Sequence, residues 1–291
     1  MGEPVPPALS PSTRLAVLLG DPVAHSRSPT IHNAAFRALG LDAVYLACRV
    51  ASGDLPAAVA GLRALGVFGA NVTIPHKETV VSLVDRLTPE AEAIGAVNTI
   101  VVETDGTLVG ANTDAVGFVQ PLVPFERQLR GQPAVILGAG GAARAVAYAI
   151  LAALQPSRLT IAARQREQAE TLLYALAPYD PRGVLHAVAL EEAAVPMIRE
   201  ARLLVNATPV GMAPHPEATP WPHATDFHAE QVIYDLVYAP AETRFLRDAV
   251  VHGAIPVGGL AMLIGQGAAA FEHWTGQAMP LDAVRLALAG T

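Results

Sequence analysis

Lysine is almost absent from this sequence. Of the 19 Lys and Arg residues, 18 are Arg and only Lys77 is lysine. Most surface positions accept either cation, so a strong preference for Arg would empty the chain of lysine. A lysine that survives this preference is a candidate for a task that Arg cannot perform, because Arg stays protonated whereas a lysine amine can release and regain a proton. Either Lys77 is a chance survivor on the surface, or a functional site needs its amine.

Charge and cysteine are scarce as well. Charged residues make up 15% of the chain, the formal net charge is −7, and the basic residues form no run. A nucleic-acid partner is therefore not expected, because phosphate neutralisation needs clustered cations. The single cysteine, Cys48, cannot form an intrachain disulfide, which favours the reducing cytoplasm. The longest apolar stretch, residues 134–154, contains several glycines and Arg144, so no membrane span is expected.

Apolar residues, in contrast, are plentiful. They make up 52% of the 291 residues, which is enough for one large domain or two of ordinary size. Short apolar runs alternate with helical patterns, which predicts α/β domains with largely parallel sheets. In the first part we expect strands at residues 15–20, 43–50 and 67–74, a hairpin at 97–109, and helices at 30–39, 54–65 and 76–87. In the second part we expect strands at 134–137, 159–163, 184–188, 203–206 and 232–235, and helices at 142–154, 165–176, 260–274 and 281–289.

A glycine-rich turn follows the strand predicted at residues 134–137. Gly138, Gly140 and Ala143 fit the pattern G-x-G-x-x-G/A between a strand and a helix, which is the context that this motif requires. Such glycines allow a tight turn and a close approach of the backbone to a pyrophosphate at the helix N-terminus. The turn therefore predicts a dinucleotide site, although an ordinary strand–helix turn would also satisfy the bare motif.

The end of the next strand indicates which dinucleotide binds. An NAD site would place an acidic residue there to hold the ribose 2′-hydroxyl. This chain instead has Arg164 and Arg166 at that point and no acid. Arginines can hold a 2′-phosphate with paired hydrogen bonds, so the sequence favours NADP over NAD. The alternative is that one or both arginines are solvated residues at the start of a helix.

Three polar segments interrupt the apolar pattern of the first part. They are residues 20–33 (GDPVAHSRSPTIHN), residues 69–77 (GANVTIPHK), and a third that joins residues 95–99 (GAVNT) to residues 110–114 (GANTD). Their hydroxyls, amides, amine and carboxylate cluster near predicted strand ends, where open α/β sheets bind ligands. Hydroxyl donors for a carboxylate, with amides and a charged pair for ring hydroxyls, suit a small polyhydroxylated acid.

Together these segments resemble the shikimate dehydrogenase family. The resemblance continues through residues 206–212 (NATPVGM), 234–238 (YDLVY), 243–246 (TRFL) and 259–266 (GLAMLIGQ). It implies a two-domain α/β enzyme. An N-terminal open α/β substrate domain would be completed by the C-terminal helices (residues 1–115 with 259–291), and a Rossmann-type dinucleotide-binding domain would comprise residues 116–258.

The resemblance also implies an activity. It is the reversible reduction of 3-dehydroshikimate to shikimate with NADPH, a step of chorismate and aromatic amino acid biosynthesis. The expected partners are this small-molecule substrate and NADP, and a homodimer is left open. Two alternatives remain: a quinate/shikimate dehydrogenase with relaxed substrate or cofactor use, and a catalytically silent NADP-binding module of the same fold.

Carried over by position, the resemblance gives each matching residue a role. The catalytic pair is Lys77 and Asp114. The substrate-binding residues are Ser26 and Ser28 for the carboxylate, and Thr73, Asn98, Gln266 and Tyr238 for the rest of the molecule. The cofactor-binding residues are Gly138, Ala139, Gly140, Gly141, Ala142, Arg164, Arg166, Thr208, Gly259 and Met262. Hydride transfer to a ketone leaves negative charge on oxygen, and a lysine can supply both the cation and the proton needed there.

The chain departs from the family pattern at two places, and several residues have simpler interpretations. Part of the usual phosphate clamp is replaced by Gln165 and Gln168, and Ala261 stands where a glycine is usual. Ser26 and Asp114 could be helix caps, and asparagines such as Asn98 and Asn112 could be turn residues. The histidines have no spacing typical of metal ligands, so no metal is expected.

Overall fold

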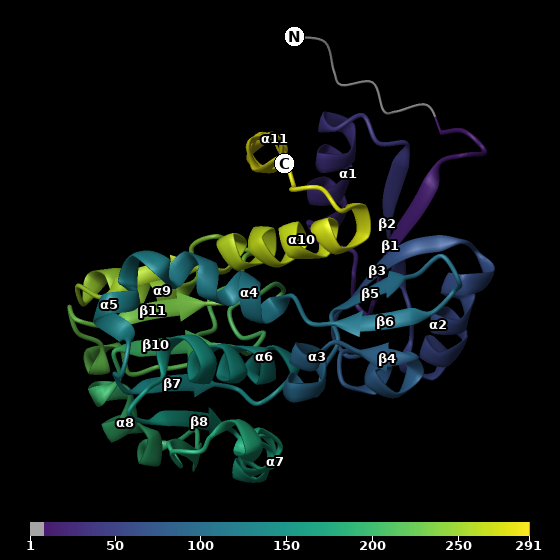
Figure 1. The fold of residues 1–291 in the computed structure, drawn as a ribbon. Helices are drawn as coiled ribbons and strands as arrows, with labels where there is room; N and C mark the ends of the chain where they lie inside the picture. Colours follow the sequence, from purple (N-terminus) through teal and green to yellow (C-terminus); the bar gives the residue numbers. More distant parts are fainter. Residues whose placement is uncertain (1–8, 291) are drawn as a thin grey trace. The chain divides into compact units, whose positions relative to one another are not determined.

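The computed structural model describes residues 9–290, and these residues form two compact units (Figure 1). The first unit comprises the described residues up to Ala91, residues 96–113 and the residues from Gly267 onward. The second comprises residues 92–95 and 114–266. Two helices, α3 (Pro89–Ile94) and α10 (Gly259–Thr275), contain residues of both units. None of the helices in the described part of the chain is long and apolar enough to span a membrane.

The first unit is built on a six-stranded sheet in the order β2-β1-β3-β5-β6-β4. Its strands are β1 (Arg14–Gly20), β2 (Ala43–Arg49), β3 (Val67–Val72), β4 (Arg86–Leu87), β5 (Thr99–Val102) and β6 (Leu108–Ala111). Its helices are α1 (Ser28–Ala38), α2 (Leu55–Ala64) and α11 (Leu281–Ala289), with the 3₁₀ turns η1 (Ser52–Asp54) and η2 (Thr79–Leu83). In this sheet only β5 runs against the direction of the others, as the predicted hairpin requires.

The two faces of this sheet are covered by different side chains. On one face, aliphatic residues of β1 and β3 pack with α2 through Leu55, Val59 and Leu62. On the other face, aromatic rings of α1, β2, β3 and the end of α10 pack together. A Cβ atom at Gly69 would lie 2.5 Å from the ring of Trp274, so the tryptophan can lie on β3 only because position 69 is glycine. Burial on both faces is why β1 and β3 read as continuous apolar runs.

The helix expected at residues 76–87 is wrong. The chain instead forms η2, then the short β4, and then α3. Tertiary contacts override the helical pattern here. Asp85 Oδ2 accepts a hydrogen bond of 2.7 Å from the N–H of Leu108, and Arg86 pairs with Val109 as β4 joins the edge of the sheet.

The second unit contains an all-parallel sheet in the order β9-β8-β7-β10-β11-β12. Its strands are β7 (Ala134–Leu137), β8 (Leu159–Ala163), β9 (Leu185–Ala189), β10 (Leu203–Asn206), β11 (Val232–Asp235) and β12 (Ile255–Gly258). Its helices are α4 (Asp114–Val119), α5 (Glu126–Leu129), α6 (Gly141–Ala149), α7 (Arg166–Leu176), α8 (Val195–Glu200) and α9 (Arg244–Val251). Short 3₁₀ or π segments are η3 (Gln120–Phe125), η4 (Ile150–Leu154), η5 (Ala177–Tyr179), η6 (Glu192–Ala194) and η7 (Ala224–Asp226).

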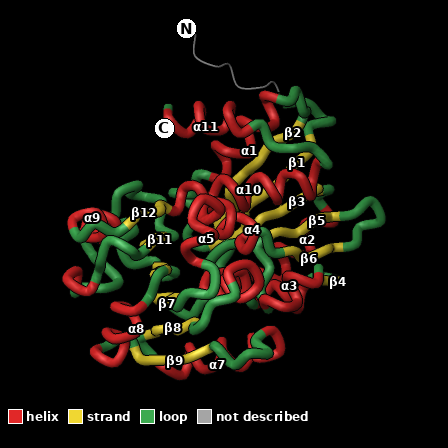
Figure 2. Tube along the Cα trace, turned by 60° about the vertical axis from the view of Figure 1, so that its left-hand side comes forward, coloured by secondary structure: helices red, strands yellow, loops and turns green. Residues whose placement is uncertain are grey.

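The strand order of the second unit determines where a ligand can bind. Numbered from β7, it is 3-2-1-4-5-6, the doubly wound order of dinucleotide-binding sheets. Helices α8 and α9 pack on one face through Ile198 and Phe245, while α4 contributes Phe118, whose ring stacks on Tyr234 at 5.0 Å. Figure 2 shows β7, β8 and β9 side by side with α7 beside β9. The order reverses between β7 and β10, so their carboxyl ends form the expected binding edge.

Candidate functional site

The glycine turn after β7 has the geometry of a phosphate cradle. Gly138 has φ +109°, a conformation that favours glycine, and a Cβ there would lie 2.8 Å from Thr208 Cγ2. At Gly140, by contrast, an added Cβ would have no described protein atom within 4 Å. Helix α6 starts at Gly141, and among the described residues no side chain caps its first turn. Backbone N–H groups at a helix N-terminus beside open space fit a pyrophosphate, so the residues present suit the dinucleotide.

Arg164 and Arg166 lie directly after β8, next to the strand that carries the glycine turn. Both are exposed. Arg166 begins α7, and its Nε donates a 2.8 Å hydrogen bond to Glu170 Oε1 one helical turn later. Arg166 is therefore already engaged in an ion pair on the surface of α7. Arg164 is the more available cation for a 2′-phosphate.

In the first unit, the polar segments meet at one edge of the sheet. This edge is formed by the carboxyl ends of β1, β3 and β6 and the amino end of β5. The N–H of Val72 donates to the carbonyl of Asn98 at 2.8 Å, and the N–H of Asn98 donates to that of Ala111 at 3.1 Å. Thr73, Asn98 and Asn112 thus adjoin the ends of neighbouring strands at one edge of the sheet, as the sequence predicted.

A buried hydrogen-bond network fixes this edge. Asn98, which is 1% exposed, donates from Nδ2 to Thr113 Oγ1 at 3.0 Å and accepts from the N–H of Thr113 at 2.8 Å. Thr99 Oγ1 donates to Asn98 Oδ1 at 2.9 Å. Asn71 receives a 2.8 Å hydrogen bond from the Tyr45 hydroxyl and donates to the carbonyl of Asn98 at 3.1 Å. Asn98 is therefore a structural residue as well as a predicted ligand-binding one.

Sequence reasoning did not single out Tyr45, Thr99 or Thr113 as members of this network. Thr99 and Thr113 adjoin predicted site residues, but the pairing of β5 with β6 is what joins them. Tyr45 lies in an unremarkable strand, and nothing in its local sequence shows that its hydroxyl reaches Asn71.

Lys77 follows a tight turn at the end of β3. The N–H of His76 donates to the carbonyl of Thr73 at 2.9 Å, and the carbonyl of Lys77 accepts from the N–H of Val97 at 2.8 Å. His76 is buried, and its Nε2 lies 2.7 Å from the carbonyl of Val50. These contacts anchor the backbone on both sides of Lys77, whose side chain is half-buried. His76 is thus a structural residue.

Ser26 and Ser28 lie at the entry to α1, beyond the end of β1. Ser26 Oγ accepts a 3.2 Å hydrogen bond from the N–H of Ser28, so Ser26 does contribute to the start of the helix. Its hydroxyl hydrogen is not used by that bond and can be donated to a ligand. Ser28 is buried and Ser26 is half-buried.

The remaining predicted site residues belong to the second unit. Asp114 is the first residue of α4 and is 4% exposed. Tyr238 follows β11 and is half-buried. In α10, Gln266 donates from Nε2 to the carbonyl of Leu263 at 2.8 Å, and Met262 is buried. A Cβ at Gly259 would lie 2.3 Å from the carbonyl oxygen of Leu236, so only glycine fits where α10 begins.

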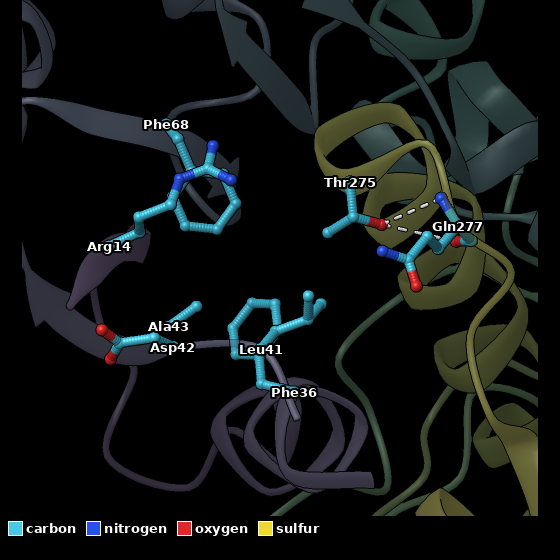
Figure 3. Close-up of a pocket in the computed structure, with 8 residues that line it drawn as sticks. All are labelled: Arg14, Phe36, Leu41, Asp42, Ala43, Phe68, Thr275 and Gln277. Atoms are coloured by element: carbon cyan, nitrogen blue, oxygen red, sulfur yellow. Dashed lines mark hydrogen bonds between the residues drawn. The ribbon is translucent and has the colours of Figure 1, made fainter. Parts of the chain in front are cut away.

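A separate small cavity, of about 110 Å³, lies at the amino ends of β1, β2 and β3 in the first unit's sheet (Figure 3). Arg14 lies over the ring of Phe68, 4.1 Å from its centroid, and Asp42 and Gln277 line the cavity nearby. Its lining includes no predicted site residue, so it is not part of the candidate site.

These features define the class of the protein. The second unit is a dinucleotide-binding α/β domain, and the first is an α/β unit that carries a dense polar site at one sheet edge. Residues 18–100 match the family model for the shikimate dehydrogenase substrate binding domain, and residues 259–288 match that for the shikimate 5′-dehydrogenase C-terminal domain.

Known proteins identify the family. The NADP(+) shikimate dehydrogenase of Salinibacter ruber is 54% identical over 96% of this chain and 98% of its own length. The Thermus thermophilus shikimate 5-dehydrogenase, solved with NADP(H) and shikimate, is 41% identical with a TM-score of 0.82 and covers 95% of this chain and 99% of its own. A quinate dehydrogenase of Corynebacterium glutamicum, solved with NAD, is 31% identical with a TM-score of 0.87 over 96% and 99%. The chain belongs to the shikimate dehydrogenase family.

Proposed function

We propose that this chain is an NADP-dependent shikimate dehydrogenase, which interconverts shikimate and 3-dehydroshikimate in aromatic biosynthesis. The proposal is supported by the polar edge of the first sheet, where the segments that carry Thr73, Lys77 and Asn98 meet, in a chain that is 54% identical to an NADP(+) shikimate dehydrogenase. In this assignment residues 1–115 with 259–291 form the substrate domain, and residues 116–258 form the NADP domain.

The proton chemistry falls to Lys77 and Asp114. Bound NADP⁺ supplies the acceptor for the hydride that leaves the alcohol carbon. The Lys77 amine takes the proton of the reacting hydroxyl, and in the reverse direction its ammonium stabilises negative charge on the carbonyl oxygen and returns the proton. Asp114 supplies a carboxylate that accepts a hydrogen bond from a substrate hydroxyl and so orients it.

Substrate recognition divides among short polar side chains. Ser26 and Ser28 donate hydroxyl hydrogens to the carboxylate. The ring hydroxyls are bound by Thr73, Asn98, Gln266 and Tyr238. Hydrogen-bonding groups of this kind discriminate strongly against analogues that lack a hydroxyl, because the buried site group is then left unpaired.

Cofactor recognition uses the second unit. The backbone of Gly138 to Ala142 holds the pyrophosphate, and Arg164, assisted by Arg166, binds the 2′-phosphate. Thr208, Gly259 and Met262 line the remainder of the cofactor site. We place the enzyme in the cytoplasm on the strength of its lone cysteine, without a nucleic-acid or membrane partner, and light scattering would show whether it is a homodimer.

An absorbance assay of NADPH formation from shikimate tests the proposal directly. We expect turnover with shikimate and NADP⁺. Parallel rates with quinate and with NAD⁺ test the second candidate, a quinate/shikimate dehydrogenase, which is favoured by the similarity to the NAD-bound quinate dehydrogenase and by the pairing of Arg166 with Glu170. A purified, folded chain that binds NADPH but oxidises neither acid would be the silent module instead.

A further inference from the structure

Asp235 is a buried carboxylate at the carboxyl end of β11, and no part of it is exposed. Its Oδ1 accepts hydrogen bonds from Asn206 Nδ2 at 2.8 Å and from the N–H of Val237 at 3.0 Å. Its Oδ2 accepts from the hydroxyl of Thr243 at 2.6 Å. Burial raises the pKa of this carboxyl, and the three donors oppose that shift by favouring the charged form.

Asn206 connects this carboxylate to the binding edge of the sheet. Asn206 pairs with Asp235 across β10 and β11, and it is itself fully buried. Its Oδ1 accepts from the Thr208 N–H at 3.0 Å and from the Thr208 hydroxyl at 2.6 Å. Asn206 Nδ2 also donates to the carbonyl of Val210 at 3.1 Å. A carboxylate and a carbonyl oxygen can only accept hydrogen bonds, so Asp235 and Val210 together hold the amide NH₂ of Asn206 on their side and its oxygen toward Thr208.

In this series of hydrogen bonds, Thr208 is the residue that lies next to the dinucleotide turn. Its Cγ2 is the atom that a Cβ at Gly138 would approach to 2.8 Å. The carboxyl ends of β7 and β10 flank the switch point of the sheet, where doubly wound folds bind their ligand. A shift of Thr208 would therefore move the wall of the phosphate cradle.

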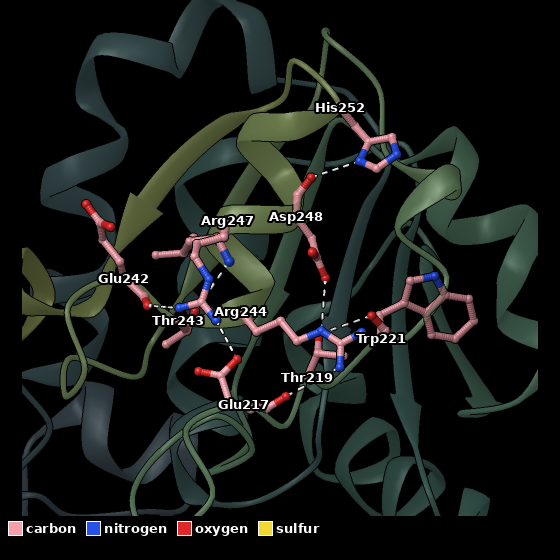
Figure 4. A network of polar contacts seen from close by, with 10 residues as sticks. Glu217, Thr219, Trp221, Glu242, Thr243, Arg244, Arg247, Asp248 and His252 are labelled. Carbon is pink, nitrogen blue, oxygen red and sulfur yellow. Dashed lines mark hydrogen bonds and ion pairs between the residues drawn. The ribbon is translucent and has the colours of Figure 1, made fainter.

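At its other end, the series of hydrogen bonds reaches Thr243 at the start of α9. Thr243 donates to Asp235 and also caps α9 by accepting from the N–H of Leu246 at 3.3 Å. A second tie between α9 and the loop after β10 lies at the surface (Figure 4), where Arg247 Nη2 donates to Glu217 Oε2 at 2.7 Å. The buried hydrogen bond from Thr243 to Asp235 is thus connected to Thr208, whereas the exposed ion pair of Arg247 with Glu217 is not.

We propose that Asp235 is a positioning residue for the dinucleotide: through the amide of Asn206 it holds Thr208 against the glycine turn. This proposal rests on the proposed function, because it takes the ligand of that turn to be NADP(H). Asp235 acts two residues away from the cofactor and takes no part in proton or hydride transfer.

The test measures NADPH affinity by fluorescence titration, which needs no turnover. Asn206→Ala and Asp235→Ala should each raise the Kd for NADPH about tenfold, while the KM for shikimate changes less than about twofold. Asp235→Asn should keep the Kd within about threefold of wild type. Its remaining oxygen still accepts from Asn206 and Val237, while its NH₂ can donate to the Thr243 hydroxyl. The double variant with Asn206→Ala and Asp235→Ala should have the same Kd for NADPH as Asn206→Ala alone, because both changes break the same series of hydrogen bonds.

Arg247→Gln is the matched control. It removes the exposed tie to Glu217 and should leave the Kd unchanged within about twofold. Unaltered NADPH affinity in Asn206→Ala, with only a lowered Tm, would overturn the proposal, because the network would then only stabilise the fold. Asn206→Ala provides this test even if the Asp235→Ala protein does not fold. Shikimate turnover by the wild-type chain, measured in parallel, reports on the proposed function alone, so the two ideas can fail separately.

Discussion

The side chain of Asn98 forms hydrogen bonds with Thr113, the residue that precedes Asp114. Asn98 Nδ2 donates to Thr113 Oγ1 at 3.0 Å, and the N–H of Thr113 donates back to Asn98 Oδ1 at 2.8 Å. One buried amide thereby ties the start of β5 to the end of β6. The same residue is proposed to bind a substrate hydroxyl, so its scaffold and ligand roles must be separated by experiment.

Replacing Asn98 with alanine tests both roles. We expect the free energy of unfolding to fall by about 1–3 kcal/mol, because the buried N–H of Thr113 loses its partner. We also expect the KM for shikimate to rise about tenfold with little change in NADPH affinity. Urea unfolding and steady-state kinetics measure these effects. Asn33→Ala is the control, because Asn33 likewise makes two hydrogen bonds to a single residue, through the backbone carbonyl and N–H of Tyr45. It should lose stability and keep its KM; an equal rise in KM in both variants would remove Asn98 from the substrate site.

Lys77 offers a chemical test that few enzymes allow. It is the only lysine, so reductive methylation addresses one side-chain amine besides the N-terminus. Lys77→Arg keeps the positive charge but cannot exchange a proton, so kcat should fall about 10²- to 10⁴-fold while the Kd for NADPH stays unchanged. Saturating shikimate should slow methylation of Lys77 in the wild-type chain. A Lys77→Arg variant with undiminished kcat would remove the amine from the mechanism.

The first two glycines of the dinucleotide turn, Gly138 and Gly140, should respond differently to alanine. Gly138→Ala places a Cβ 2.8 Å from Thr208 Cγ2 at φ +109°, so both the Tm and NADPH affinity should fall. Gly140 has φ −84° and ψ −172°, and a Cβ there meets no described protein atom within 4 Å. Gly140→Ala should therefore keep the Tm of wild type and weaken NADPH binding alone, because the methyl group enters the space assigned to phosphate. Normal affinity in Gly140→Ala would place the pyrophosphate elsewhere.

The choice between NADP and NAD should depend mainly on Arg164. Arg164→Ala should lower kcat/KM for NADP⁺ about 10- to 100-fold and leave that for NAD⁺ nearly unchanged, since only NADP⁺ carries the 2′-phosphate. Arg166→Ala should have a smaller effect, because Arg166 is engaged by Glu170 at 2.8 Å. Arg158→Gln, which breaks a surface pair with Glu200, is the control. If both cofactors lose equally in Arg164→Ala, its role is not recognition of the phosphate.

Much of the second unit could be predicted because its sheet is parallel and buried on both faces. The strands at 134–137, 159–163, 203–206 and 232–235 begin and end where the apolar runs do. The last strand, β12, was not predicted, because Pro256 argues against a strand. Since β12 lies at the edge of the sheet, its proline costs no ladder hydrogen bond that a central strand would need.

The identity of the site residues was open to prediction, but their connections were not. Motifs point to Thr73, Lys77 and Asn98, because polar residues at strand ends carry a local signal. The bond between Asn206 and Asp235 depends on the register of β10 against β11, which no local pattern contains. Helix α9 was also not predicted, although Thr243 followed by apolar residues at helical spacing is a readable start signal.

His32 should make the stability of the first unit depend on pH. The imidazole is fully buried, stacks on Tyr45 at 4.5 Å and packs beside Trp274. Neither ring nitrogen has a hydrogen-bond partner among the residues that the structure describes. Burial lowers the pKa of His32 to about 3, with a smaller opposing effect from the Asn71 side chain. The folded state therefore holds this imidazole neutral in a cage of aromatic rings.

The sign of the effect follows from the two pKa values. In the unfolded chain the imidazole titrates near its usual value of 6.5, whereas in the folded chain its pKa is about 3. Between these values the unfolded state binds more protons. The stabilisation is thus complete above about pH 6.5 and is lost as the pH falls toward about 3, by about 1.4 kcal/mol per pH unit. Urea unfolding between about pH 7 and about pH 5 should show this decline in wild type and a flatter profile in His32→Leu. Equal slopes in the two proteins would mean that His32 gains its proton without unfolding, and that the aromatic cage admits the charged ring.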